Sequence, residues 1–139
     1  MPKSDYRLEA QIGFALRQAN QRHTAIFARG MANQFTPTQW AALVKLKELG
    51  TSSQNRLGRA TAMDVATIKG VVDRLLARGL VKALRDPGDG RRVTISLTEA
   101  GSRIVDKGLP AARQISEQTV KGLSETERTT LMALLRKIS

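Results

Sequence analysis

Residues 54–97 read QNRLGRATAMDVATIKGVVDRLLARGLVKALRDPGDGRRVTISL, and this stretch decides the fold. A short helical run at 54–60 is followed by a small-residue turn and by Asp64, a residue type that caps helix N-termini by accepting a backbone N–H bond. The next segment, 65–78, spaces its apolar residues as an amphipathic helix does, and Gly79 is typical of the residue that ends a helix. The pattern predicts two helices joined by a tight turn.

Two short runs follow the second helix and have the pattern of a β-hairpin. In the run at 93–97 apolar and polar residues alternate, which is typical of a strand with one buried face. With the run at 81–85 it predicts a hairpin whose turn, 86–92, ends in two arginines. Helix, turn, helix and hairpin in this order describe a winged helix-turn-helix, whose second helix enters a DNA major groove. The arginines are placed for an adjacent minor groove or phosphate row.

The composition fits one globular domain. The 139 residues are 41% hydrophobic, enough for a packed core, and contain no cysteine, which excludes disulfides and thiolate metal sites. No apolar run approaches the roughly 20 residues that span a bilayer, and the N-terminus lacks the apolar centre of a signal peptide. We therefore expect a cytoplasmic protein without a membrane partner.

Positive charge is concentrated on the predicted helix-hairpin unit. The chain carries 23 Lys and Arg against 12 Asp and Glu, a formal net charge of +11, and residues 54–92 hold nine cations against four acids. A basic block on a helix-turn-helix pattern is typical of a protein that binds a polyanion. The alternative is a basic surface without a partner.

Helices are predicted on both sides of this unit. A long helix is expected from Asp5 to about Ala32, with an apolar stripe too long for one small domain to cover. Thr36, Pro37 and Gln39 predict the capped start of a second helix that Gly50 ends. Ser53 is a plausible cap for the short helix that follows it.

The C-terminal part of the chain predicts two more helices. One is capped by Thr98 and is expected to kink or break at 108–110, because a proline there removes a helix hydrogen bond. The other starts at a capping box, 124–127. We predict a mainly α single domain, 1–139, with a small β-hairpin wing. In it 1–35 and 99–139 are dimerisation helices around a winged helix-turn-helix lobe at 36–98.

The whole chain resembles bacterial transcription regulators of the MarR family. The resemblance is carried by Leu57-Gly58, by Val71-Val72-Asp73-Arg74-Leu75 with Arg78-Gly79-Leu80-Val81, by Asp86-Pro87 with Asp89-Gly90-Arg91-Arg92, and by Ser96-Leu97-Thr98-Glu99-Ala100-Gly101. It implies a homodimer that binds a palindromic operator in double-stranded DNA, usually as a repressor. It also implies release by a small, often aromatic or phenolic, effector bound between the dimerisation helices and the lobe. The cysteine-based redox sensing of one branch of the family is excluded here.

Three residues on the early exposed face of the second helix are candidate DNA contacts. Ala66 can meet a thymine methyl group, and Thr67 can bond a base edge or a phosphate. The alternative for Thr67 is local capping by its hydroxyl. Lys69 fits a phosphate better than a base, and Arg74 is expected to touch the DNA backbone or pair with an acid.

The wing and the supporting helix supply the remaining DNA candidates. Of Arg91 and Arg92, one is expected to face the minor groove and the other to pair with Asp89 or Asp73 and hold the shape of the wing. The resemblance favours Asp89 with Arg91; a solvated loop is the alternative. The start of the supporting helix can bind a phosphate through its N–H groups, and its candidates are Ser53, Gln54, Asn55 and Arg56.

Four residues outside the DNA-binding unit are candidates for the effector. His23 can bond a carboxylate or phenol, Trp40 can stack on an aromatic ring, and Arg17 can clamp a carboxylate if it points inward. Phe27 lies beside His23 on the first helix. The alternatives are an exposed or interface histidine and a tryptophan of the core.

The remaining residues give little support to catalysis. One histidine and no cysteine provide few groups for acid–base or nucleophilic chemistry, so we expect no enzyme, no cofactor and no metal. Two functions remain: an effector-released, sequence-specific repressor, or a constitutive, weakly specific architectural DNA binder without effector.

Overall fold

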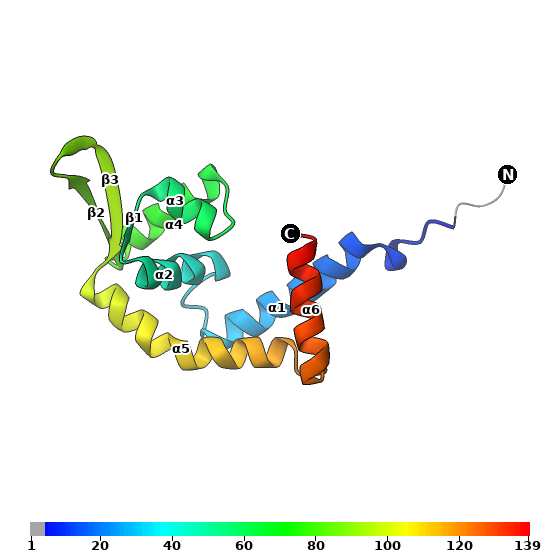
Figure 1. The fold of residues 1–139 in the computed structure, drawn as a ribbon. Helices are drawn as coiled ribbons and strands as arrows, with labels where there is room; N and C mark the ends of the chain where they lie inside the picture. The colour runs from blue at the N-terminus through cyan, green and yellow to red at the C-terminus, as the bar shows by residue number, and fades with distance from the viewer. Residues whose placement is uncertain (1–4) are drawn as a thin grey trace.

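The computed structural model describes residues 5–139, which form helices with a small sheet at one edge of the molecule (Figure 1). A 3₁₀ turn, η1 (Leu8–Ala10), precedes helices α1 (Ile12–Gly30), α2 (Pro37–Leu49), α3 (Gln54–Ala60) and α4 (Val65–Ala77). Helices α5 (Glu99–Thr119) and α6 (Glu125–Lys137) end the chain. Strands β1 (Thr51–Ser52), β2 (Val81–Asp86) and β3 (Asp89–Leu97) form an antiparallel sheet in the order β1-β3-β2. The fold is therefore the predicted winged helix-turn-helix between N- and C-terminal helices.

Every predicted capping residue caps a helix. The side-chain oxygens of Thr36, Ser53, Asp64, Thr98 and Ser124 each accept a hydrogen bond from the third residue of the helix that follows. These bonds satisfy N–H groups that have no partner inside the helix. Local chemistry thus fixes where all five helices after α1 begin.

The first helix is shorter than predicted. The expected helix from Asp5 is wrong at its N-terminal end, because Gln11 has extended backbone angles (φ −89°, ψ 135°) that separate η1 from α1. The Gln11 side chain donates a hydrogen bond to the Arg7 carbonyl, 2.8 Å away, and so stabilises the separate turn. At the other end Ala32 and Asn33 have positive φ angles and lead the chain into α2.

The wing differs from the prediction in length and in its turn. Both hairpin strands extend beyond the predicted 81–85 and 93–97, because Asp86 pairs with Asp89 across a turn of Pro87 and Gly88. The Asp86 carboxylate accepts the Gly88 N–H at 2.9 Å, which closes this turn locally. Arg91 and Arg92 therefore lie on β3 and not in the turn. Strand β1 was not predicted.

Helix α5 is continuous through Pro110, so the predicted break is absent from it. Figure 1 shows its two halves running in different directions, as a bend at a proline would produce. Gly108, two residues before Pro110, packs under the Trp40 ring, and a Cβ there would approach the ring to 2.7 Å. Trp40 thereby joins α5 to the DNA-binding lobe.

The core of the lobe consists of aliphatic side chains. Leu43, Leu46, Leu57, Ile68 and Leu75 are all at most 1% exposed and bring α2, α3 and α4 together. Burial of such side chains is the main stabilising contribution, about 1.5–3 kcal/mol each. Helix α6, in contrast, buries none of its residues. In residues 5–139 no helix is both long and apolar enough to cross a membrane.

Candidate nucleic-acid interface

Helix α4 presents a capped N-terminus and a mostly small-residue face to solvent. The Thr67 backbone N–H donates to the Asp64 carboxylate at 2.7 Å. Hydrogen bonds from the backbone and side chain of Thr67 hold the pKa of Asp64 below its ordinary value, so the cap is ionised. Ala66 and Thr67 are exposed, as predicted for DNA contacts. Thr67 serves the cap as well, and its contact with DNA remains a prediction.

The charged residues of α4 pair differently from the prediction. Lys69 donates to the Asp73 carboxylate at 2.9 Å, one helical turn apart. The expected pair of Asp73 with a wing arginine is not among the ion pairs found in residues 5–139, and its carboxylate bonds Lys69 of its own helix instead. Arg74 is exposed, and within residues 5–139 it forms none of the ion pairs found. It is thus accessible to a phosphate.

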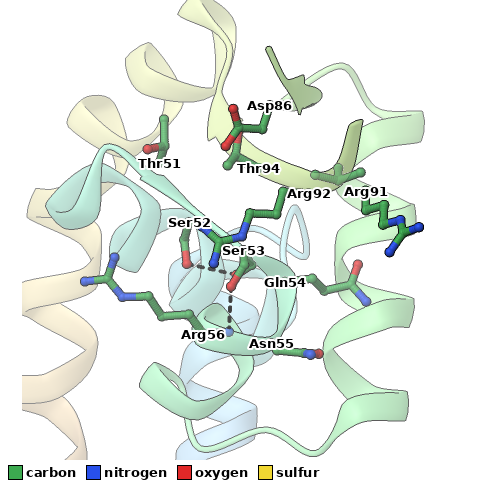
Figure 2. A pocket seen from close by; sticks show the side chains of 11 residues that line it. Thr51, Ser52, Ser53, Gln54, Asn55, Arg56, Asp86, Arg91, Arg92 and Thr94 are labelled. Carbon is green, nitrogen blue, oxygen red and sulfur yellow. Dashed lines mark hydrogen bonds between the residues drawn. The ribbon is translucent and has the colours of Figure 1, made fainter. Parts of the chain in front are cut away.

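A groove of about 560 Å³ separates the wing from the start of α3. Figure 2 shows Arg92 reaching across it toward Ser52 and Ser53, whereas Arg91 points away from it. Both guanidinium groups are exposed. The groove is lined by residues of β1, α3 and the wing: Thr51, Ser52, Ser53, Gln54, Asn55, Arg56, Asp86, Arg91, Arg92, Val93 and Thr94. The fold thus brings the predicted α3 and wing candidates to one place.

The groove is electropositive, because three arginines and one acid, Asp86, line it. Ser53 has its Oγ engaged by the Arg56 N–H at 3.2 Å, which orients the first turn of α3. Guanidinium groups beside hydroxyl and amide side chains form a surface suited to phosphate oxygens. The basic groove is therefore a candidate surface for DNA contact, in addition to the predicted contacts on α4.

Asp89 bonds the backbone of the wing. Its carboxylate accepts the Arg91 N–H at 3.1 Å. The expected side-chain pair between Asp89 and an arginine is not among the ion pairs found in residues 5–139. The hydrogen bond that Asp89 does accept is of the turn type and leaves both guanidinium groups available, and the role of Asp89 in stabilising the wing stays a prediction.

The four effector candidates do not converge on one pocket within the chain. His23 Nδ1 lies 2.8 Å from Thr119 Oγ1 and lines a groove between α1 and α6. The Arg17 guanidinium lies 5.6 Å from the Phe14 ring, and Trp40 is buried against Phe35. Phe27 is 6% exposed, with its ring centroid 6.3 Å from that of His23. For Trp40 the alternative of a core residue is the correct one.

Two features go beyond the sequence prediction, which gave an uncovered apolar stripe on the first helix but no groove between helices. The groove between α1 and α6 has a volume of about 740 Å³ and a lining dominated by apolar side chains, among them Ile12, Leu16, Leu131, Leu134 and Ile138. Arg78, the residue directly after α4, donates from its guanidinium group to the Gln34 carbonyl at 2.7 Å and lies 4.6 Å over the Phe35 ring. The groove could have been inferred from the unmatched stripes on both helices. The Arg78 contact depends on tertiary structure.

The capped recognition helix, the basic wing and the groove beside them define a winged-helix, DNA-binding transcription regulator. The sequence model of the MarR family matches residues 35–93. The transcriptional repressor NicR of Pseudomonas putida is 45% identical over 139 residues, which cover 99% of this chain and 88% of NicR. The chain belongs to the MarR family, and it is a transcriptional regulator.

Two solved structures share the whole architecture. A probable transcriptional regulator from Pseudomonas aeruginosa is 56% identical, covers 96% of this chain and 100% of its own, and superposes with a TM-score of 0.92. BpsR of Bordetella bronchiseptica is 39% identical over 97% of both chains, also with a TM-score of 0.92. The DNA binding of BpsR is regulated by 6-hydroxynicotinic acid.

Proposed function

We propose that this regulator is a homodimeric repressor that binds an inverted-repeat operator and is released by a small hydroxylated aromatic acid. It acts by binding and not by catalysis, and it acts in the cytoplasm, where the DNA lies. The observation that carries the proposal is the combination of one basic DNA-facing surface with one uncovered apolar groove on the same chain.

The groove between α1 and α6 favours a second copy as its occupant. Ile12 is 70% exposed and Ile138 is 65% exposed, which is unfavourable for large apolar side chains in water. Ile12 begins α1 and Ile138 directly follows α6, whereas the predicted DNA contacts lie on α3, α4 and the wing. A two-fold axis through the terminal helices would leave both DNA-facing surfaces free for two half-sites.

The lining of the same groove also includes polar groups suited to an effector. Asn20, His23 and Lys137 line it among apolar side chains. An aromatic ring suits the apolar walls, a hydroxyl group suits the imidazole, and a carboxylate suits the ammonium group. The regulation of BpsR by 6-hydroxynicotinic acid supports this chemical class. Arg17 does not line this groove in its own chain, and it remains a candidate partner for the effector's carboxylate.

Release follows from differential affinity. An effector that binds more tightly to a dimer with mis-spaced recognition helices shifts the population toward that state and weakens DNA binding. Titration of the protein–operator complex with 6-hydroxynicotinic acid, and with nicotinic acid as the control that lacks the hydroxyl group, tests this. We expect release by the first at lower concentration. Equal or absent responses would contradict the effector class while leaving the DNA-binding proposal standing.

A further inference from the structure

Val65 is a large apolar side chain on the surface of the recognition helix. It is the first residue of α4, directly after the Asp64 cap, and is 71% exposed. The other branched aliphatic residues near the start of α4, Ile68, Val71 and Val72, are at most 2% exposed and belong to the core. Val65 is therefore the branched aliphatic residue of this part of α4 that packing inside the chain does not explain.

Local helix chemistry does not explain Val65 either. A β-branched residue has a lower helix propensity than alanine, so the start of α4 would form more readily without it. The apolar residue that precedes the cap is Met63, which packs against the core cluster that includes Ile68. That pair occupies the positions of a hydrophobic staple. Val65 lies outside this arrangement.

Few side chains near Val65 on the outer face of α4 are free to bond a DNA base. Thr67 bonds the Asp64 cap, and Lys69 is bound to Asp73 at 2.9 Å. Ala66 carries only a methyl group, and Gly70 carries no side chain. Small side chains there allow close approach of the helix to base edges. Of these residues, Val65 brings the largest apolar group to such an approach.

The major groove offers one apolar group to such a side chain. The C5-methyl of thymine distinguishes an A·T pair there, and the N-terminal residues of a recognition helix contact base edges. We propose that Val65 packs against the methyl group of one thymine in each half-site and so helps to set the operator sequence. This inference rests on the proposed function, because it requires a specific operator.

Removal of the thymine methyl group tests directly whether Val65 contacts it. Each thymine of the selected operator is replaced in turn by deoxyuridine, symmetrically in both half-sites, and affinity is measured for the unaltered protein and for Val65→Ala. Ala66→Gly serves as the matched variant, because it removes the neighbouring methyl group. Circular dichroism of both variants verifies that the helices are retained.

We expect one position at which deoxyuridine weakens binding of the unaltered protein about fourfold per half-site, the effect of burying one methyl-sized group. At that position Val65→Ala should bind both duplexes equally, whereas Ala66→Gly should keep the difference. The inference would be overturned if deoxyuridine left the affinity of the unaltered protein unchanged at every position, or if only Ala66→Gly removed the effect of deoxyuridine. Either result would leave the proposed function intact. Failure to select any operator would overturn both.

Discussion

His23 and Thr119 form a hydrogen bond that fixes the tautomer of the histidine. Thr119 donates its one hydroxyl proton to the Ile115 carbonyl at 2.9 Å. Its oxygen lies 2.8 Å from His23 Nδ1, and with its proton already committed it accepts. In the neutral ring the proton is therefore on Nδ1, and Nε2 is an acceptor. A phenolic hydroxyl group is the natural donor to that atom.

Replacement of His23 by Asn separates its structural role from its proposed effector role. The Asn amide can donate to Thr119 in place of Nδ1 but has no atom at Nε2. We expect an unfolding free energy close to that of the unaltered protein and an affinity for 6-hydroxynicotinic acid at least about tenfold lower. His23→Ala should lose about 1 kcal/mol of stability in addition. Calorimetry measures the effector affinity, and thermal unfolding measures the stability. If His23→Asn bound the effector as tightly as the unaltered protein, the His23 ring would not be part of the effector site.

Leu134 tests the dimer interface. It is 57% exposed on α6 and lines the apolar groove, so Leu134→Lys places a charge where we expect a second chain. Sedimentation should show the dimer weakened at least about thirtyfold, since a buried charge without a partner is costly. Thr129→Lys is the control, because Thr129 lies outside the groove lining on the same helix. Equal dimer affinity in the two variants would exclude this groove as the interface.

The wing arginines should contribute to DNA binding through charge. Arg91→Ala and Arg92→Ala should each reduce the slope of log affinity against log salt by about one, and the double variant by about two. Arg113→Ala, an exposed position on α5, controls for the loss of net charge. Titrations at several salt concentrations give the slopes. If the double variant kept the affinity and slope of the unaltered protein, the wing would not contact DNA.

Gly101 is predicted to tolerate no side chain. A Cβ there would overlap the backbone carbonyl oxygen of Leu80, which cannot move without distorting the start of the wing. Gly101→Ala should lower the unfolding free energy by more than about 2 kcal/mol. Gly122→Ala is the control, since nothing lies within 4 Å of its added Cβ, and it should be neutral or slightly stabilising. Similar chemical denaturation curves for the two variants would contradict the packing described at Gly101.

Two helix caps predict a loss of stability in acid. Backbone and side-chain hydrogen bonds lower the pKa of Asp64 and of Glu127 from their ordinary values of 3.8 and 4.5. Because the pKa values of these two carboxyl groups are lower in the folded protein, their contribution to stability is fully present at pH values above the ordinary pKa. It is lost as the pH falls through the lowered pKa. The temperature of half-unfolding should therefore decrease once the pH is below about 4. The decrease should be less steep in the double variant Asp64→Asn/Glu127→Gln. An unchanged pH dependence in that double variant would assign the acid loss to other carboxylates.

The sequence predicted the starts of α2, α4 and α6 correctly because each depends on neighbours along the chain. Thr36, Asp64 and Ser124 cap helices through bonds to residues three positions on, so their pattern identifies each start. The Lys69–Asp73 pair is also local, and its spacing of four residues could have predicted it. What required the structure was contact between distant segments.

Strand β1 shows why such contacts were missed. Thr51 and Ser52 form a strand only because they pair with Ser96 and Ile95 of β3. The pattern of two residues cannot predict a pairing with such a distant segment. The effector candidates failed to converge for the same reason. Trp40 packs against Gly108 of α5 and the core, whereas His23 bonds Thr119, the last residue of α5, and lines the groove beside α6. The two side chains therefore lie in different surroundings.

Selection of bound duplexes from a random pool, at roughly physiological salt, tests the central claim most directly. A symmetric homodimer predicts an enriched inverted repeat whose half-site centres lie about one helical turn apart. It also predicts binding at least about 10³-fold tighter to that repeat than to random DNA. Recovery of no enriched sequence, with binding that collapses as salt rises, would contradict it and favour a constitutive architectural protein.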